Sequence, residues 1–251
     1  MAKKINSNFW QKKSSDKFFD VQCELRTTVA HPYILNKIKS RFDLKVLDYG
    51  CGEGDLSIKL ADSGNDIIAV DISEKSIKEA KKRYIGKKNL NFLLLEEMDP
   101  HIQYDVIILS FVLVTVKTQQ LALKLLKNIS HLLKSNGEVY FIDTHPCFRD
   151  KIFSTARTKF NYVEYSKNYI PFRVELSDCN DETKYVVFED YHKSLSEIFS
   201  IFLKNNFLIK NLDEIYDKIN DNMIDSVKFK YNSDIPIYLY LELTLLENNK
   251  V

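Results

Sequence analysis

Lys45-Val46-Leu47-Asp48-Tyr49-Gly50-Cys51-Gly52-Glu53-Gly54 is the stretch that decides the fold. It begins as a short apolar run, which is typical of a buried strand, and it ends in three glycines at alternate positions. Glycine tolerates positive φ and has no Cβ, so the backbone at the tip of this strand can approach a ligand closely. The helix predicted to follow would present its free N–H groups at the same place. The stretch therefore predicts a ligand site after the first strand of an α/β sheet.

Strands and helices alternate on both sides of this stretch. Apolar runs predict strands at residues 45–49, 66–70, 91–95, 104–109 and 138–143, and amphipathic spacing predicts helices at 56–63, 76–84 and 119–133. Continuous apolar strands that alternate with helices are typical of a parallel sheet covered on both faces. We therefore predict an α/β fold of three layers.

The remaining segments complete a single domain of residues 1–251. Residues 5–40 have helix-like spacing with a break at His31-Pro32, and we predict a helical cap over residues 1–43. Two alternating stretches, 171–176 and 184–191, predict an antiparallel hairpin within an inserted lid over residues 146–193. A helix at 194–205 and strands at 207–212 and 237–245 follow, and the last strand reads as a central one.

Composition excludes several classes of protein. The 251 residues carry a net charge of +1, which disfavours nucleic acid or a membrane surface as a partner. The four cysteines (Cys23, Cys51, Cys147 and Cys179) lie far apart without CxxC pairing, which argues against a zinc site or a disulfide framework. We predict no metal site. No signal peptide or membrane-spanning run is visible, so we expect a cytoplasmic location.

The spacing of the glycines and the acid before them distinguish two ligands. A dinucleotide requires G-x-G-x-x-G, whereas Gly50, Gly52 and Gly54 give G-x-G-x-G. Asp48 would repel a pyrophosphate but suits a ligand with an α-ammonium group. S-adenosylmethionine carries an ammonium and a sulfonium and has no phosphate. Charge therefore favours the methyl donor over NAD.

Two later acidic segments fit the same ligand. Asp71, followed by Ile72, ends the second predicted strand, where a carboxylate can accept both ribose hydroxyls. NAD-binding folds use the same feature, so Asp71 alone does not discriminate. Glu96-Glu97-Met98 follows the third strand, where an acid can reach the adenine amino group and an apolar neighbour can pack on the ring. Taken alone, Glu96 and Glu97 read more readily as surface charges; the order of the three elements favours the adenine interpretation.

With these motifs the chain resembles the class I S-adenosylmethionine-dependent methyltransferases, in particular their small-molecule branch. The resemblance implies a seven-stranded sheet of order 3-2-1-4-5-7-6 with an antiparallel seventh strand, a position that residues 237–245 fit. Residues 131–138 also look like the family's turn from a helix into the fifth strand. For the donor site, the resemblance implies that Arg26 meets the donor carboxylate; the alternative is a surface arginine. Cys51 lies in the glycine turn, so we predict that its backbone lines the donor pocket, and we assign Ser110 to the same pocket.

The acceptor side is less defined. The Asn/Asp-Pro-Pro-aromatic motif of many enzymes that methylate nucleic-acid bases is absent after the fourth strand, where Ser110-Phe111-Val112-Leu113 stands. Residues 144–148 and 190–193 resemble segments that line acceptor pockets. His145 or His192 is a candidate catalytic base, since histidine titrates near neutral pH; the alternative is that each only hydrogen-bonds to the backbone.

We therefore predict methyl transfer from S-adenosylmethionine to an O or N atom of a small-molecule acceptor by in-line displacement. The sequence leaves three other readings: an RNA or protein methyltransferase, a catalytically idle donor-binding or scaffolding protein, and an NAD-dependent oxidoreductase. The glycine spacing disfavours the last of these. Neither the acceptor nor the oligomeric state follows from the sequence.

Overall fold

The computed structural model describes residues 26–148, 152–153, 156–160, 164–177, 185–216 and 235–246. The elements that build the main sheet and its helices are η2 (Arg26–Ala30), α1 (His31–Ile38), β1 (Lys45–Tyr49), α2 (Asp55–Asp62), β2 (Asp66–Asp71), α3 (Glu74–Arg83), β3 (Leu90–Leu94), η3 (Leu95–Glu97), β4 (Tyr104–Ser110), η4 (Leu113–Thr115), α4 (Gln119–Leu132), β5 (Leu133–Thr144), α5 (Leu195–Leu203), β10 (Phe207–Ile215) and β11 (Tyr238–Leu245). The first 25 residues of the predicted helical cap lie outside the described part of the chain.

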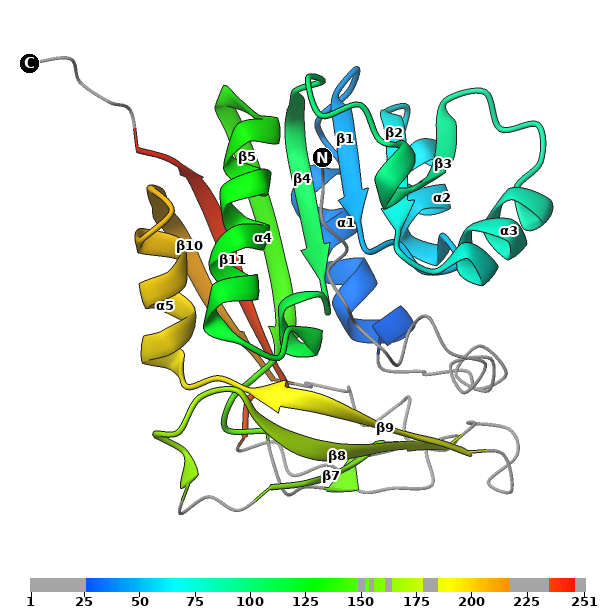
Figure 1. Cartoon of the computed structure of the whole chain (residues 1–251). Coiled ribbons are helices and arrows are strands. Elements are labelled where there is room, and N and C mark those ends of the chain that lie inside the picture. The colour runs from blue at the N-terminus through cyan, green and yellow to red at the C-terminus, as the bar shows by residue number, and fades with distance from the viewer. Residues whose placement is uncertain are drawn as a thin grey trace, which may run out of the picture.

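Seven strands form the main sheet in the order β10-β11-β5-β4-β1-β2-β3 (Figure 1). The five strands from β1 to β5 pair in parallel. The last strand, β11, pairs antiparallel with both β5 and β10. With the inserted strands left out of the count, this is the predicted order 3-2-1-4-5-7-6, and the central place of the final strand is confirmed.

Helices cover both faces of this sheet, as the continuous apolar strands require. Helices α1, α2 and α3 bury side chains such as Ile34, Leu60 and Ile77 against one face. Helices α4 and α5 bury side chains such as Leu126 and Ile201 against the other. Figure 1 shows α4 and α5 in front of the sheet and α1, α2 and α3 behind it. The three predicted layers are thus confirmed.

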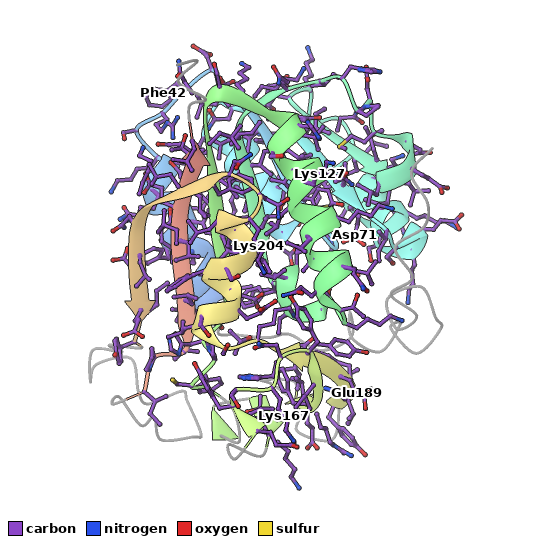
Figure 2. The ribbon with its side chains drawn as sticks, turned by 60° about the vertical axis from the view of Figure 1, so that its left-hand side comes forward. Phe42, Asp71, Lys127, Lys167, Glu189 and Lys204 are labelled. Carbon is purple, nitrogen blue, oxygen red and sulfur yellow. The ribbon has the colours of Figure 1, made fainter. Side chains whose placement is uncertain are left out.

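The insertion is larger than the predicted hairpin. The pair β8 (Ile170–Ser177) and β9 (Tyr185–His192) confirms that hairpin, and β6 (Ile152–Phe153) and β7 (Ala156–Lys159) extend it to a four-stranded antiparallel sheet. These two strands are too short for a period-2 pattern to emerge from the sequence. In Figure 2, Lys167 and Glu189 mark the inserted sheet, and Phe42 marks the opposite end of the molecule. The inserted sheet therefore lies beyond the carboxyl ends of β4 and β5 (Figure 1).

Two boundaries differ from the prediction. Helix α4 ends at Leu132, and Leu133 adopts extended backbone angles and pairs with Tyr104. β5 therefore begins earlier than predicted, and no separate turn stands between it and the helix. At the other end of the chain, the spacing before Pro32 is helical, but residues 26–30 form a π-helix that runs into α1. No helix in the described ranges is long and apolar enough to cross a membrane.

Candidate functional site

The glycine turn after β1 is folded tightly against the tip of β2. The N–H groups of Gly50 and Cys51 both donate to the carbonyl oxygen of Val70, at 2.8 and 3.0 Å. Gly50, Gly52 and Gly54 have φ values of +82°, +55° and +84°, which residues with a Cβ rarely adopt. The turn then leads directly into α2, whose N-cap is Gly54. The predicted glycine turn between a strand and a helix is thus confirmed.

Each glycine of the turn faces a different neighbour. A Cβ at Gly50 would lie 2.6 Å from Cγ2 of Val112, and a Cβ at Gly54 would lie 2.5 Å from Cζ of Phe92. At Gly52, by contrast, a Cβ would meet no atom within 4 Å. Gly50 and Gly54 are therefore required by packing, whereas Gly52 borders open space in which a ligand can approach the backbone.

Asp71 links the end of β2 to the glycine turn. One carboxylate oxygen accepts the N–H of Gly52 at 2.9 Å, and the other accepts the N–H of Ser73 at 2.8 Å. Burial raises the pKa of Asp71, and the bonds from the backbone oppose this effect. The neighbouring Ile72 is half-buried. Each carboxylate oxygen has a second lone pair, so Asp71 can still accept bonds from a ligand's hydroxyl groups.

Asp48 lies beneath the turn rather than at its surface. Its side chain is 1% exposed and accepts a hydrogen bond of 2.6 Å from the hydroxyl of Ser57 in the first turn of α2. Burial raises the pKa of Asp48 to about 6; the bond from Ser57 lowers this pKa, and the charge of Asp71 raises it. Two carboxylates thus lie close together in a dry site, which disfavours a phosphate and favours a cation.

This raised pKa predicts how stability changes with pH. The folded protein holds the Asp48 proton more tightly than an unfolded chain, in which the pKa is the ordinary 3.8. Protonation of Asp48 therefore stabilises the folded state; this contribution is complete below about pH 3.8 and is lost as pH rises through about 6. We expect Asp48→Asn to remove this loss, so that the variant gains stability relative to the wild type by about 2 to 3 kcal/mol between pH 4 and 7. Urea unfolding at several pH values measures the difference. Asp66→Asn, at the exposed start of β2, is the control; an equal change in it would contradict the assignment to Asp48.

The other predicted donor residues lie beside the start of α2 and after β3. Arg26 lies 3.8 Å from the carboxylate of Asp55, the first residue of α2. Glu96 and Glu97 are exposed in η3, after β3, and Met98 is half-buried. The Glu97 carboxylate accepts the N–H of Leu94 at 2.9 Å. Arg26 thus lies beside the helix that follows the glycine turn, while the two glutamates follow β3, which pairs with β2.

The tip of β4 carries a feature that the sequence did not reveal. The hydroxyl of Ser110 is buried and has no hydrogen-bond partner among the described residues. The next residue, Phe111, has φ +56°, a conformation that bulky residues rarely adopt. Since Asp48 pairs with Ile108 in the sheet, Ser110 continues β4 at the level of Gly50. Strain and an unsatisfied polar atom at one strand end are typical of functional sites.

The two candidate histidines are both fully buried and bonded. Nδ1 of His145 accepts the N–H of Cys147 at 3.1 Å, and Nε2 lies 3.0 Å from the carboxylate of Glu214. Nε2 of His192 lies 2.9 Å from the carbonyl oxygen of Tyr165, to which it must donate. The two residues sit at the ends of β5 and β9. Their catalytic role stays a prediction.

Two buried charged residues, Asp143 and Lys193, lie where the inserted sheet meets β5. A hollow of about 10 Å³, room for about one water molecule, is lined by Leu113, Val114, Asp143, Thr144, Tyr191, Lys193 and Ile198. Asp143 and Lys193 are 4% and 2% exposed. Three of these residues fall in the two segments predicted to line an acceptor pocket. This space is far smaller than the pockets that hold most ligands, so it is not by itself an acceptor pocket.

No group of three potential metal ligands occurs in the part of the chain that the structure describes.

Comparison with known proteins identifies relatives over nearly the whole chain. A family model described as "Methyltransferase domain" matches residues 41–202. The ubiquinone biosynthesis O-methyltransferase of Rickettsia typhi is 29% identical, over 96% of this chain and 89% of the relative. The enzyme of the same name from Rickettsia bellii is 28% identical, over 97% and 93%.

Solved structures share the fold at low identity. An S-adenosylmethionine-dependent methyltransferase from Mesorhizobium loti superposes with a TM-score of 0.59 at 17% identity, covering 85% of this chain and 95% of that one. The CcbJ methyltransferase from Streptomyces caelestis gives a TM-score of 0.63 at 11% identity, covering 96% and 99%.

Proposed function

The chain belongs to the class I S-adenosylmethionine-dependent methyltransferases, and from this premise we propose that it methylates an oxygen atom of a small molecule. The relatives named as O-methyltransferases of ubiquinone biosynthesis, similar over nearly their whole length, support oxygen as the acceptor atom. A nitrogen acceptor is the second candidate.

The observation that carries the donor assignment is the group formed by Gly52, Asp71 and Asp48. Gly52 borders open space, so the backbone can come close to a ligand. Asp71 joins the glycine turn to β2 and retains lone pairs for the hydroxyls of a ribose. The buried carboxylates of Asp48 and Asp71 fit a ligand with an ammonium and a sulfonium but no phosphate. We assign Gly50, Cys51 and Ile72 to the walls of the same pocket.

The remaining donor contacts are assigned by position. We propose that Arg26, beside the N-terminus of α2, meets the donor carboxylate. Glu96 or Glu97 would reach the adenine amino group, with Met98 packed on the ring. Ser110 would contact the amino-acid end of the donor, because it lies at the level of Gly50 and its hydroxyl has no partner within the described chain.

Methyl transfer from this donor requires the protein mainly to position the two reactants. When bound, S-adenosylmethionine supplies a methyl group on a positively charged sulfur, which needs no further activation. The residues of this chain would hold the donor and acceptor in line and exclude water. The inserted sheet lies beyond the carboxyl ends of β4 and β5, where it can close such a site (Figure 1).

A proton must leave the acceptor hydroxyl if it is not ionised before attack. His145 and His192 are our candidates for the base. His145 would accept a proton at Nδ1 only after losing the bond from Cys147, and His192 would have to use Nδ1, since Nε2 donates to Tyr165. If one of these histidines is the base, we expect its glutamine variant, His145→Gln or His192→Gln, to lower kcat by about 100-fold. The decline of kcat at low pH should also disappear in that variant. Unchanged kcat in both variants would end the base hypothesis.

The contact of Ser110 with the donor has its own test. Two ligands serve as probes: S-adenosylhomocysteine, and 5′-methylthioadenosine, which lacks the amino-acid end. We expect Ser110→Ala to weaken binding of the first by about fivefold, the value of one hydrogen bond, and to leave the second unchanged. Calorimetry measures both affinities. Equal losses for the two ligands would show that Ser110 only packs the site.

The proposed function is tested in two steps. Calorimetry with S-adenosylhomocysteine and with NAD tests the donor, and failure to bind the former would overturn the donor site. Release of the labelled methyl group from S-adenosylmethionine is then measured with phenols, other alcohols, amines, carboxylic acids and RNA. Transfer to a hydroxyl compound supports the proposal. Transfer to RNA or protein alone, or to nothing in the presence of donor binding, would favour the other readings.

A further inference from the structure

The loop of residues 111–118, between β4 and α4, packs against both the glycine turn and the inserted sheet. On one side, Cγ2 of Val112 occupies the space where a Cβ at Gly50 would lie. On the other side, Val114 is buried in the hydrophobic core of the inserted sheet, together with Phe160 and Phe172. A displacement of this loop would therefore reach both the donor turn and the inserted sheet.

The loop enters this position under strain. Phe111 adopts φ +56°, and its N–H donates to the carbonyl oxygen of Ile142 in β5 at 2.9 Å. A bulky residue keeps such a conformation only where its surroundings hold it. The loop therefore depends on contacts made further along its length.

Two buried charged side chains supply those contacts. A carboxylate oxygen of Asp143, at the end of β5, accepts the N–H of Val114 at 2.7 Å. The ammonium of Lys193, which follows β9, donates to the carbonyl oxygen of Val116 at 2.8 Å. The first bond ties the loop to the main sheet, and the second ties it to the insertion.

Lys193 is itself fixed from the insertion and from α5. Its ammonium donates to the carbonyl oxygen of Tyr191 at 3.1 Å and lies 4.9 Å from the centre of the Tyr169 ring. The hydroxyl of Tyr169 donates to Glu197, at the start of α5, at 2.7 Å. A cation over a ring whose hydroxyl is held by a carboxylate has little freedom to move, so the inserted sheet sets where the loop lies.

We propose that Lys193 is a positioning residue that couples the inserted sheet to the donor site through the 111–118 loop. It acts without touching the donor: it holds Val116, the loop holds Val112 against Gly50, and Gly50 shapes the turn. By linkage, donor binding then stabilises the inserted sheet as much as the inserted sheet supports donor binding. This inference rests on the proposed function, because it takes the glycine turn as the donor site.

Three variants of the full chain test the coupling. Lys193→Met keeps the apolar stem and removes the donors to both carbonyls, and Lys193→Arg retains donors. Lys167→Met, at an exposed lysine of the insertion (Figure 2), is the control. Calorimetry with S-adenosylhomocysteine is expected to show a loss of about tenfold in Lys193→Met, and affinities within about threefold of wild type in the other two.

Hydrogen exchange separates coupling from a general loss of stability. With S-adenosylhomocysteine bound to wild type, we expect slower exchange both at residues 50–54 and at the amides of β8 and β9. In Lys193→Met at saturating ligand, the first effect should remain and the second should disappear. Wild-type affinity in Lys193→Met, an affinity in Lys193→Arg as low as in Lys193→Met, or no slowing in β8 and β9 of the wild type would overturn the proposal. Failure of the wild type to bind the ligand would instead overturn the proposed function.

Discussion

Replacing Asp71 with alanine is expected to weaken S-adenosylhomocysteine binding by roughly 100-fold, or about 3 kcal/mol. Hydrogen bonds to a charged group contribute about 1.5 to 3 kcal/mol each, and the proposed ribose contacts would be lost. The N–H groups of Gly52 and Ser73 would also lose their acceptor, so the turn itself would loosen. Calorimetry at a temperature where both proteins are folded measures the change.

Asp71→Asn separates the charge from the geometry. Both carboxylate oxygens accept backbone N–H groups, so the amide nitrogen of an asparagine must face one of these donors. We expect a loss close to that of the alanine variant. Asp66→Ala, at the exposed opposite end of the same strand, should bind like the wild type. An Asp71→Ala protein with unchanged affinity would remove Asp71 from the donor site.

Replacing Gly50 with alanine is expected to lower stability by about 3 kcal/mol and donor affinity by more than tenfold. An alanine at φ +82° costs about 1 to 2 kcal/mol, and its methyl group would collide with Val112 at 2.6 Å, which adds about 1 to 3 kcal/mol. Relief of the collision would move either the turn or the 111–118 loop, and both border the donor site. Urea unfolding and calorimetry measure the two effects.

Gly86 provides a matched control, because its φ is +86° and a Cβ there would meet nothing within 4 Å. Gly86→Ala should show only the conformational cost, about 1 kcal/mol, and normal donor binding. Val112→Ala combined with Gly50→Ala should recover the part of the loss that comes from the collision. Equal destabilisation by Gly50→Ala and Gly86→Ala would contradict the steric argument.

Local patterns in the sequence were sufficient for most of the main sheet. β1 has the predicted bounds, and α3 begins after Ser73, a residue type typical of N-caps, whose hydroxyl accepts the N–H of Ser76 at 3.2 Å. Both depend on neighbours close in the chain. The early start of β5 depends instead on pairing with Tyr104, a contact between distant residues that no local pattern contains.

The residues of the candidate site also differ in whether local sequence or distant contacts determine where they lie. The glycines and Asp71 could be placed because turn geometry and strand ends follow from local sequence. That Asp48 stays a predicted donor residue follows from its place before the glycines, but its burial against Ser57, nine residues along the chain in α2, did not follow from the local pattern. The bonds of Asp143 and Lys193 to the 111–118 loop join segments far apart in the sequence. That the hydroxyl of Ser110 has no hydrogen-bond partner among the residues described depends on its whole surrounding, which no local pattern contains.

The central place of β11 has a consequence for biosynthesis. Because β11 lies between β5 and β10, the main sheet cannot close until residues 238–245 have left the ribosome. Until then, β5 and β10 each expose an unpaired strand edge, and the sites of Leu239, Leu241 and Leu243 in the core are unfilled. Folding of this sheet is therefore completed only after residues 238–245 have been synthesised, and a chain that stops short of β11 exposes strand edges that favour aggregation.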